Sequence, residues 1–399
     1  MQIMKVFMFS SSRVVRFLAV CFALSNVSIN ANAKVDLLAE LKAWDEASFT
    51  EVADYYVGIF HYDGEHAWFE GQGNVDKSAI RETFYTLLFL DGYGALNGPA
   101  ARFPDSLRAF ILRWLASKQA ADGFFYDHPE QASELTTKRR IDFLSCARRI
   151  NEMLGGSPRF PYPESKESAP PELASPERYR AWLESLAFTN PYGDGAMIAM
   201  YQNVIARFPD QHAYGEELAE FLPTRQQPGT GLWGTDPKRR DYRYISGAMK
   251  IDQAVSKPWM RGVKPYRLAQ EIWTSTLAAV LSGEGDQSVW VRNAPQVMLA
   301  TIDQLPEPPS PELWQQIIEQ VRRDTERLRN ADGGFGRSIP LASNANDTKL
   351  MAESTRRLYY QLMGFGDSDQ FRDFPGLATI LPRLESRIRG RDNGSHLKD

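Results

Sequence analysis

The sequence predicts an all-α protein, and three observations support that prediction. Apolar residues recur at intervals of three and four along most of the chain, which is the spacing of one helix face. Segments in which apolar and polar residues alternate strictly, the pattern of half-buried strands, are not evident. One short glycine-centred pattern occurs three times, each time directly after a segment of helical spacing. These features together predict about a dozen helices.

The predicted helices follow one another with short connections. Their approximate ranges are 36–58, 77–91, 104–120, 131–154, 176–188, 194–208, 214–226, 240–254, 264–282, 288–304, 311–329, 347–363 and 373–389. Ser175 before Pro176 is typical of a helix start, because the hydroxyl can cap free amides and proline fits the first turn. Gly155 and Gly364 mark helix ends. The proline-rich stretches 157–176 and 305–311 are expected to be surface connections within one domain.

The first 33 residues have the composition of an export signal. Three basic residues precede an apolar run at 17–24, and Ala31-Asn32-Ala33 supplies the small-x-small pattern of a signal-peptidase site. We expect a mature single-domain chain of residues 34–399 that is periplasmic or secreted. The apolar run is far shorter than the ~20 residues that a membrane-spanning helix needs, so no membrane span is expected.

The charge and cysteine content of the mature chain narrow its function further. Residues 1–33 contain three of the 46 basic residues and none of the 50 acidic ones, so the mature net charge is −7. Nucleic-acid binding calls for a concentrated basic face and is not expected. Cys146 is the only cysteine after residue 33, which excludes an intramolecular disulfide and favours a buried apolar role for this residue.

The three glycine-centred segments have similar composition and regular separation. They read QAADGFF at 119–125, QPGTGLWG at 227–234 and RNADGGFG at 329–336, and their glycines Gly123, Gly231 and Gly333 lie 108 and 102 residues apart. Glycine accepts the positive φ that ends a helix, and the aromatic residue that follows can fold back onto the turn. A degenerate fourth copy is Tyr62–Trp68.

These segments resemble the glutamine-tryptophan repeat of the squalene-hopene cyclase and protein prenyltransferase superfamily. Leu115 and Leu222 stand four residues before Gln119 and Gln226, as that repeat prefers. The resemblance implies an α/α toroid, a ring of helical hairpins, in which the repeat residues are structural and alternate helices line a central cavity. It covers only the turns and says little about function.

The chain departs from the superfamily's catalytic motifs. It contains no Asp-x-Asp-Asp acid of the class II cyclases, and its single remaining cysteine does not match the zinc ligands of the prenyltransferases. His61 and His66 flank Asp63, but a separation of five residues suits neither a helix face nor a tight loop. No cofactor or metal site is therefore expected.

The segments that follow the repeats are the predicted places for a site. After the second copy, Arg240 and Arg243 precede Gly247 and Lys250, and the last three share a helix face. Two interpretations of that face stay open: a groove over the glycine for an anionic group, or a solvated basic face around a glycine needed for close helix packing. After the third copy, Glu353 lies four residues before Arg357, and an ordinary surface pair is expected there.

We expect an exported carbohydrate-active enzyme that acts on an acidic glycan, by analogy with other toroids. In a lyase, Tyr244 or His128 would abstract a proton beside a carboxylate held by Arg243 and Lys250. In a hydrolase, Asp127 and Asp241 would flank the bond.

Two alternatives to this expectation remain. One is a non-catalytic binding protein with an aromatic cavity containing Trp68, Trp233, Trp259 and Trp273, and the other is a terpenoid-cyclase-like protein with a changed acid. A cavity in which Asp, His, Tyr and Arg converge would favour glycan chemistry, whereas an apolar aromatic one would favour a lipid. The sequence does not determine the oligomeric state.

Overall fold

A computed structural model describes residues 31–71, 78–96, 103–128, 135–163, 169–260, 266–365 and 377–394. The described chain is mostly helical, which confirms the all-α prediction. Its α-helices are α2(Ala31–Gly58), α3(Ala79–Gly92), α4(Asp105–Ser117), α5(Thr137–Leu154), α6(Pro176–Ser185), α7(Pro191–Ile205), α8(Gln211–Thr224), α9(Tyr242–Val255), α10(Ala269–Leu281), α11(Ser288–Thr301), α12(Pro311–Glu326), α13(Ala345–Lys349), α14(Thr355–Leu362) and α15(Leu377–Gly394). The π-helix η6(Leu350–Ser354) joins α13 to α14, and the predicted export signal falls almost wholly on residues 1–30, outside the described residues.

The predicted helix ends are present where capping chemistry was visible in the sequence. Ser175 Oγ accepts from the main-chain N–H of Arg178 at the start of α6, and Gly155 ends α5 with a φ of 68°. Helix α7 begins earlier than predicted, because Asn190 supplies the cap and accepts from Gly193 N. Asp194 lies inside the first turn of this helix.

A small sheet corrects the prediction that strands are absent. Strands β1(Phe60–Tyr62) and β2(Ala67–Phe69) pair antiparallel, with Phe60 opposite Phe69. Three-residue strands are too short to give an alternating pattern that stands out from the surrounding sequence. The hairpin contains the degenerate fourth copy of the repeat and lies between α2 and α3.

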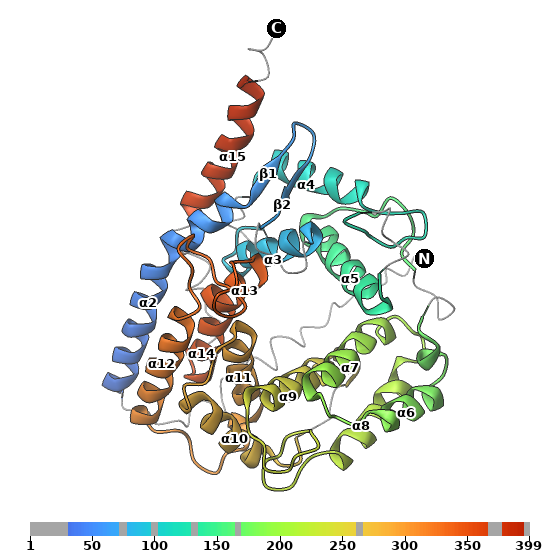
Figure 1. Cartoon of the computed structure of the whole chain (residues 1–399), viewed down its shortest axis with the longest axis vertical. Helices are drawn as coiled ribbons and strands as arrows, with labels where there is room; N and C mark the ends of the chain where they lie inside the picture. The colour runs from blue at the N-terminus through green and yellow to red at the C-terminus, as the bar shows by residue number, and fades with distance from the viewer. Residues whose placement is uncertain are drawn as a thin grey trace, which may run out of the picture.

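The helices fall into two sets in Figure 1. Helices α3, α5, α7, α9, α11 and α13 lie toward the middle of the view, and we call these, with η6 and α14, the inner helices. Helices α2, α4, α6, α8, α10 and α12 lie outside them. Contacts run from α3 to α5, from α5 to α7, from α7 to α9, from α9 to α11 and from α11 to α14, and α13 contacts α3. One extended core of buried apolar side chains fills the space between the two sets.

The three repeated turns have the same local geometry. Each forms an isolated antiparallel bridge, Gln119 with Phe125, Gln226 with Trp233 and Arg329 with Phe335. The positive φ values predicted for Gly123, Gly231 and Gly333 are confirmed at 80°, 70° and 82°. The glutamine equivalent to Gln119 is therefore Gln226, one residue before the segment that the sequence pattern suggested.

In the first two turns, a glutamine side chain joins the turn to a segment 41 residues later in the chain. Gln119 Nε2 donates to the carbonyls of Gly123 and Phe160, and its Oε1 accepts from Phe160 N. Gln226 repeats this arrangement with Gly231 and with Arg267 N, just before α10. A Cβ on Gly231 would lie 2.6 Å from Leu268 O, so the turn has no room for a side chain.

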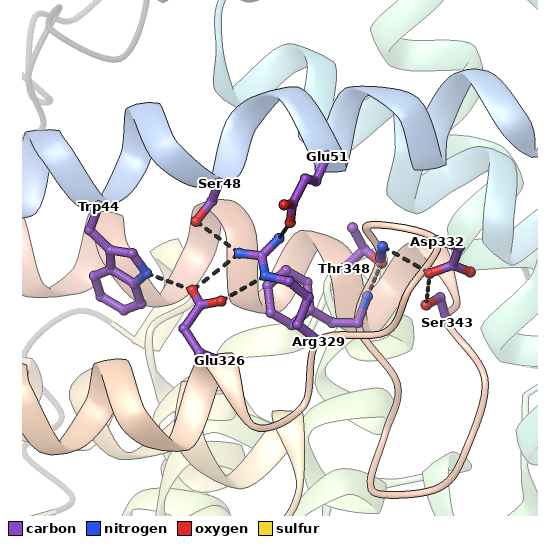
Figure 2. A network of polar contacts seen from close by, with 10 residues as sticks. Trp44, Ser48, Glu51, Glu326, Arg329, Asp332, Ser343 and Thr348 are labelled. Atoms are coloured by element: carbon purple, nitrogen blue, oxygen red, sulfur yellow. Dashed lines mark hydrogen bonds and ion pairs between the residues drawn. The ribbon is translucent and has the colours of Figure 1, made fainter.

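The third turn makes the equivalent junction with the first helix of the described chain. Arg329 replaces glutamine, and its guanidinium donates to Ser48 of α2 and pairs with Glu51 and with Glu326 at the end of α12 (Figure 2). A Cβ on Gly333 would lie 2.1 Å from Glu51 O. The sequence separation between Ser48 and Arg329 is 281 residues, so this contact brings the two ends of the helical array together.

Candidate functional site

Six charged or hydroxyl-bearing side chains extend from the inner helices and the loop before α13. We call this set the inner cluster: Arg81 of α3, Asp142 of α5, Tyr192 of α7, Lys250 of α9, Arg292 of α11 and Arg337. Electrostatic effects link its members across different helices, because charges on Arg292, Asp142 and Arg337 shift the pKa of Lys250. The inner helices therefore direct several charges toward one another.

Lys250 is held at a close crossing of α7 and α9. A Cβ on Gly195 would lie 2.9 Å from Lys250 Cβ, and the Lys250 ammonium lies 5.6 Å from the centre of the Tyr192 ring. Its Nζ donates to Gln253 Oε1 at 3.1 Å. Burial, together with the charge of Arg292, lowers the pKa of Lys250 to about 8, so a sizeable neutral fraction exists near physiological pH.

Arg292 is half-buried on α11, and its only side-chain hydrogen-bond partner among the described residues is neutral. Its guanidinium donates to Gln296, which in turn donates to Asp252 at 2.7 Å. Arg292 Nε is buried and has no hydrogen-bond partner among the described residues. Burial lowers the pKa of Arg292, which is the direction expected for a cation removed from water.

The other two cations of the inner cluster are paired with carboxylates. Arg81 Nε lies 3.2 Å from Asp142 Oδ2, and Arg337 Nε lies 3.0 Å from Asp347 Oδ1. Within the described chain, neither Lys250 nor Arg292 has a carboxylate oxygen within 4.0 Å of its nitrogens. Two positive charges on neighbouring helices thus lack a direct ionic partner.

Tyr192 adds a hydroxyl group to this positive environment. Burial raises the pKa of Tyr192, and the charges of Arg337 and Arg81 oppose that rise. The phenol is therefore protonated at neutral pH and can donate a proton or a hydrogen bond.

Glu82 is a buried carboxyl group close to the inner cluster. It accepts from Ala345 N at 2.8 Å, at the start of α13, and only 2% of the residue is exposed. Burial raises its pKa to about 7, although the bond from Ala345 and the charge of Arg81 lower it. Glu82 can therefore exchange a proton near neutral pH, and it links α3 to α13 in both protonation states.

The predicted acids Asp127 and Asp241 both cap inner helices. Asp127 Oδ1 accepts from Ile80 N at the start of α3, and Asp241 Oδ1 accepts from the N–H groups of Arg243 and Tyr244 at the start of α9. Asp127 and His128 line one cavity of about 240 Å³, whereas Asp241 and Arg243 line another of about 620 Å³. The two carboxylates proposed for a hydrolase therefore lie at separate cavities.

The remaining predicted residues of the second repeat make local structural contacts. Tyr244 is buried and its Oη accepts from Asp236 N at 3.1 Å. Trp233 is fully buried and donates to Leu222 O, and Arg240 donates to Gly229 O. Of the residues predicted after this repeat, Lys250 alone belongs to the inner cluster.

The groove predicted over Gly247 does not exist. A Cβ at Gly247 would lie 2.6 Å from Pro191 Cβ, because α7 packs directly against this position. Close helix packing, the other interpretation, explains the glycine. Arg243 is exposed at the start of α9, whereas Lys250 lies at the crossing with α7.

Glu353 is not part of an ordinary surface pair. It is 3% exposed within the π-helix η6, where it accepts from Lys349 at 2.8 Å and pairs with Arg357 at 3.4 Å. Burial raises its pKa, but Lys349 and Arg357 outweigh burial and lower it. The surface interpretation of Glu353 and Arg357 is wrong because helical spacing does not reveal which face of the π-helix lies inside.

Sequence reasoning missed Arg292, Tyr192, Arg81 and Asp142. One signal was available for Arg292, because it is the only charged residue in α11. A single charge on an otherwise apolar helix must be paired, solvated or functional. No comparable signal marks Tyr192, which follows a proline at the start of α7.

Comparison with protein-family models, curated proteins and solved structures finds no match to this chain. Among the described residues, no helix has the length and apolar character needed to cross a membrane. Nor do any three His, Cys, Asp or Glu side chains in the described ranges form a group suited to a metal ion.

Proposed function

We propose that this protein is an exported enzyme that cleaves an acidic glycan by β-elimination at the inner cluster, within an α/α toroid. The order of contacts among the inner helices supports the toroid, since α13 contacts α3 after the chain has passed through the other four. The junction of Arg329 with α2 supports it as well.

The observation that carries the proposed activity is the pair of cations without carboxylate partners, Lys250 and Arg292. A half-buried positive charge without a counter-ion is unfavourable, and a bound anion would compensate it. The carboxylate of a uronate sugar is such an anion, and the planar guanidinium of Arg292 suits a two-oxygen acceptor.

The same residues can provide the proton transfers of a lyase. Binding of the uronate carboxylate to Arg292 would make the proton on C5 more acidic, and neutral Lys250 would remove that proton. The electrons of the C5–H bond form the C4–C5 double bond as the C4–O bond breaks. Tyr192 then donates its proton to the departing oxygen, and proton exchange with solvent restores both side chains. The base is thus Lys250 in place of Tyr244 or His128.

The alternatives differ in what they require of the inner cluster. A binding protein would hold the same polymer and release no product. An apolar isoprenoid would leave Lys250 and Arg292 without a counter-charge, which is unfavourable in a half-buried site. The convergence of Arg, Asp and Tyr side chains therefore favours the glycan.

Incubation of the purified protein with a panel of uronate-containing and neutral polysaccharides tests the proposal. We expect unsaturated sugar ends, detected by ultraviolet absorbance, from a uronate polymer alone, with a rate that rises with pH through about 8 as Lys250 loses its proton. Lys250→Met is expected to lower the rate by about 100-fold or more. Lys238→Met, at an exposed lysine before α9, is the matched control. Failure of every uronate polymer to yield product would remove the proposal.

A further inference from the structure

A cavity separate from the inner cluster lies beside the β1–β2 hairpin. It has a volume of about 240 Å³ and is bounded by the hairpin, the start of α3, the end of α4 and the residues after the first repeated turn. We call it the rim cavity. Figure 1 places the hairpin next to α4, at the edge of the molecule and away from α9 and α11. Ligand sites for drug-sized molecules are commonly about 300–1,000 Å³, so this volume suits a single small ring.

Two tryptophans give the rim cavity its apolar surface. The rings of Trp68 on β2 and Trp114 on α4 are nearly parallel, with an angle of 9° and centroids 6.4 Å apart. Trp68 is half-buried, and its Nε1 donates to Glu70 Oε2 at 3.0 Å, which fixes the indole orientation. The Trp68 ring also stacks on His61, with an angle of 13° and centroids 5.4 Å apart, so the indole is rigid and can present its edge to a ligand at low entropic cost.

Hydrogen-bond donors and acceptors line the cavity together. Asp63 and Glu70 are exposed carboxylates, and His66 lies 3.2 Å from Asp63 Oδ2 through its Nδ1. Lys118 donates to Asp127 O at 2.9 Å, and its ammonium lies 5.9 Å from the Trp114 ring centre. The cavity therefore offers carboxylate acceptors beside ammonium and imidazole donors.

This mixture selects among ligand classes. An anion would be repelled by Asp63 and Glu70, and a cation would meet Lys118 already placed against Trp114. A sugar hydroxyl both donates and accepts, so neighbouring hydroxyls can bond to the carboxylates and to His66 or Lys118 at once. The apolar side of a sugar ring can then lie against the edge of the half-buried Trp68 indole.

We propose that the rim cavity binds one neutral sugar unit, as a site separate from the inner cluster and without a catalytic role. The ligand is a neutral hexose or a terminal neutral residue of a glycan. The site does not depend on the activity proposed above, because none of the residues lining it belongs to the inner cluster.

Ligand-observed NMR with a panel of methyl glycosides of neutral hexoses tests this inference. We expect saturable binding of at least one glycoside with a Kd on the order of 1–10 mM, the range of a small ligand with few contacts. Trp68→Ala is expected to weaken binding at least about tenfold. Trp290→Ala, which truncates another half-buried tryptophan at a different cavity, should leave it unchanged.

Further variants separate recognition from folding and from the inner cluster. Glu70→Gln preserves the shape of the side chain but removes its charge, and it should weaken binding even if Trp68→Ala disturbs the hairpin. Lys250→Met should bind the glycoside as the wild type does. No saturation by any neutral glycoside at about 50 mM, unchanged affinity in both cavity variants, or tighter binding of tetramethylammonium or free uronate would overturn the inference.

Discussion

Two arginines on neighbouring inner helices, Arg356 buried and Arg292 half-buried, have different environments. Arg356 on α14 is 1% exposed, its Nη1 lies 2.7 Å from Asp45 Oδ1 on α2, and its guanidinium lies 4.5 Å from the centre of the Trp44 ring. Arg292 on α11 bonds to neutral Gln296 and has no carboxylate within ion-pair distance in the described chain. Arg356 thus has a carboxylate in direct contact, whereas the charges of Glu353 and Asp252 act on Arg292 without such contact and partly oppose the lowering of its pKa.

The different environments of Arg356 and Arg292 indicate different roles for the two arginines. Arg356 and Asp45 join α14 to α2, near the junction that Arg329 makes between α12 and α2, so this pair contributes to holding the two ends of the helical array together. Lys250 and Arg292 join no elements by ionic contact. We attribute their retention to a ligand, since an unpaired half-buried charge lowers stability without one.

The largest expected change in stability comes from breaking the ion pair between Arg356 and Asp45. Asp45→Ala leaves Arg356 buried without a counter-charge and should lower the free energy of unfolding by about 3–5 kcal/mol, measured by denaturant titration. Asp54→Ala, on the same helix, removes the partner of Arg383 in an exposed pair and should cost less than about 1 kcal/mol. Equal losses of unfolding free energy in the two variants would show that burial does not make the Asp45–Arg356 pair more important for stability than the exposed pair.

Glu82, a buried carboxyl group that accepts a hydrogen bond from the main-chain N–H of Ala345, should have an effect of intermediate size on stability. The pKa of Glu82 is raised from 4.5 to about 7, so the folded protein binds its proton more tightly than the unfolded chain does. Its stabilising contribution is complete below pH 4.5 and is lost as pH rises through about 7, by up to about 3 kcal/mol.

Denaturant titration between pH 4 and 8 measures this loss. Glu82→Gln should remove it, because the amide does not titrate. Glu216→Gln, at an exposed glutamate of α8 whose charge does not contribute to the pKa of Glu82, should retain the wild-type dependence. An identical pH profile for wild type and Glu82→Gln would contradict the buried, proton-binding role of this side chain.

Substitution of Lys250 should change the free energy of unfolding by a smaller amount and in the opposite direction. Lys250→Met removes a half-buried cation that lacks a carboxylate partner within the described chain, so the free energy of unfolding should stay the same or rise by about 1 kcal/mol while the proposed lyase activity is lost. Differential scanning calorimetry at pH 7 measures the change, with Lys238→Met as the exposed control. A loss of stability comparable to that of Asp45→Ala would mean that Lys250 has a structural role.

The all-α class and many helix ends were predictable because their signals are local. Ser175 with Pro176 and the glycine at 155 mark helix ends through the chemistry of a few neighbouring residues. The turn glycine Gly231 was recognisable for the same reason, as its positive φ depends on its own backbone. The short β1–β2 hairpin was missed because three-residue strands leave no periodic pattern.

The candidate site was less predictable because it depends on contacts between distant helices. The sequence directed attention to polar residues after the turns, and two of these are caps: Asp241 caps α9, which follows it, whereas Asp127 caps α3, which lies 47 residues earlier in the chain. The i, i+4, i+7 pattern correctly placed Gly247 and Lys250 on α9, but it could not indicate that Pro191 occupies the space above the glycine. Arg292 is the only charged residue of α11, but only the structure shows that, in the described chain, it has no carboxylate within ion-pair distance.

The most direct test of the proposed role of Lys250 and Arg292 is a calorimetric titration with two matched oligosaccharides. One is a uronate oligomer, and the other is the same oligomer with its carboxyl groups reduced to alcohols. We predict that the wild type binds the uronate oligomer at least about tenfold more tightly, and that Arg292→Met abolishes this preference without unfolding the protein. Equal affinity of the wild type for both oligomers, or an unchanged preference in Arg292→Met, would contradict the account.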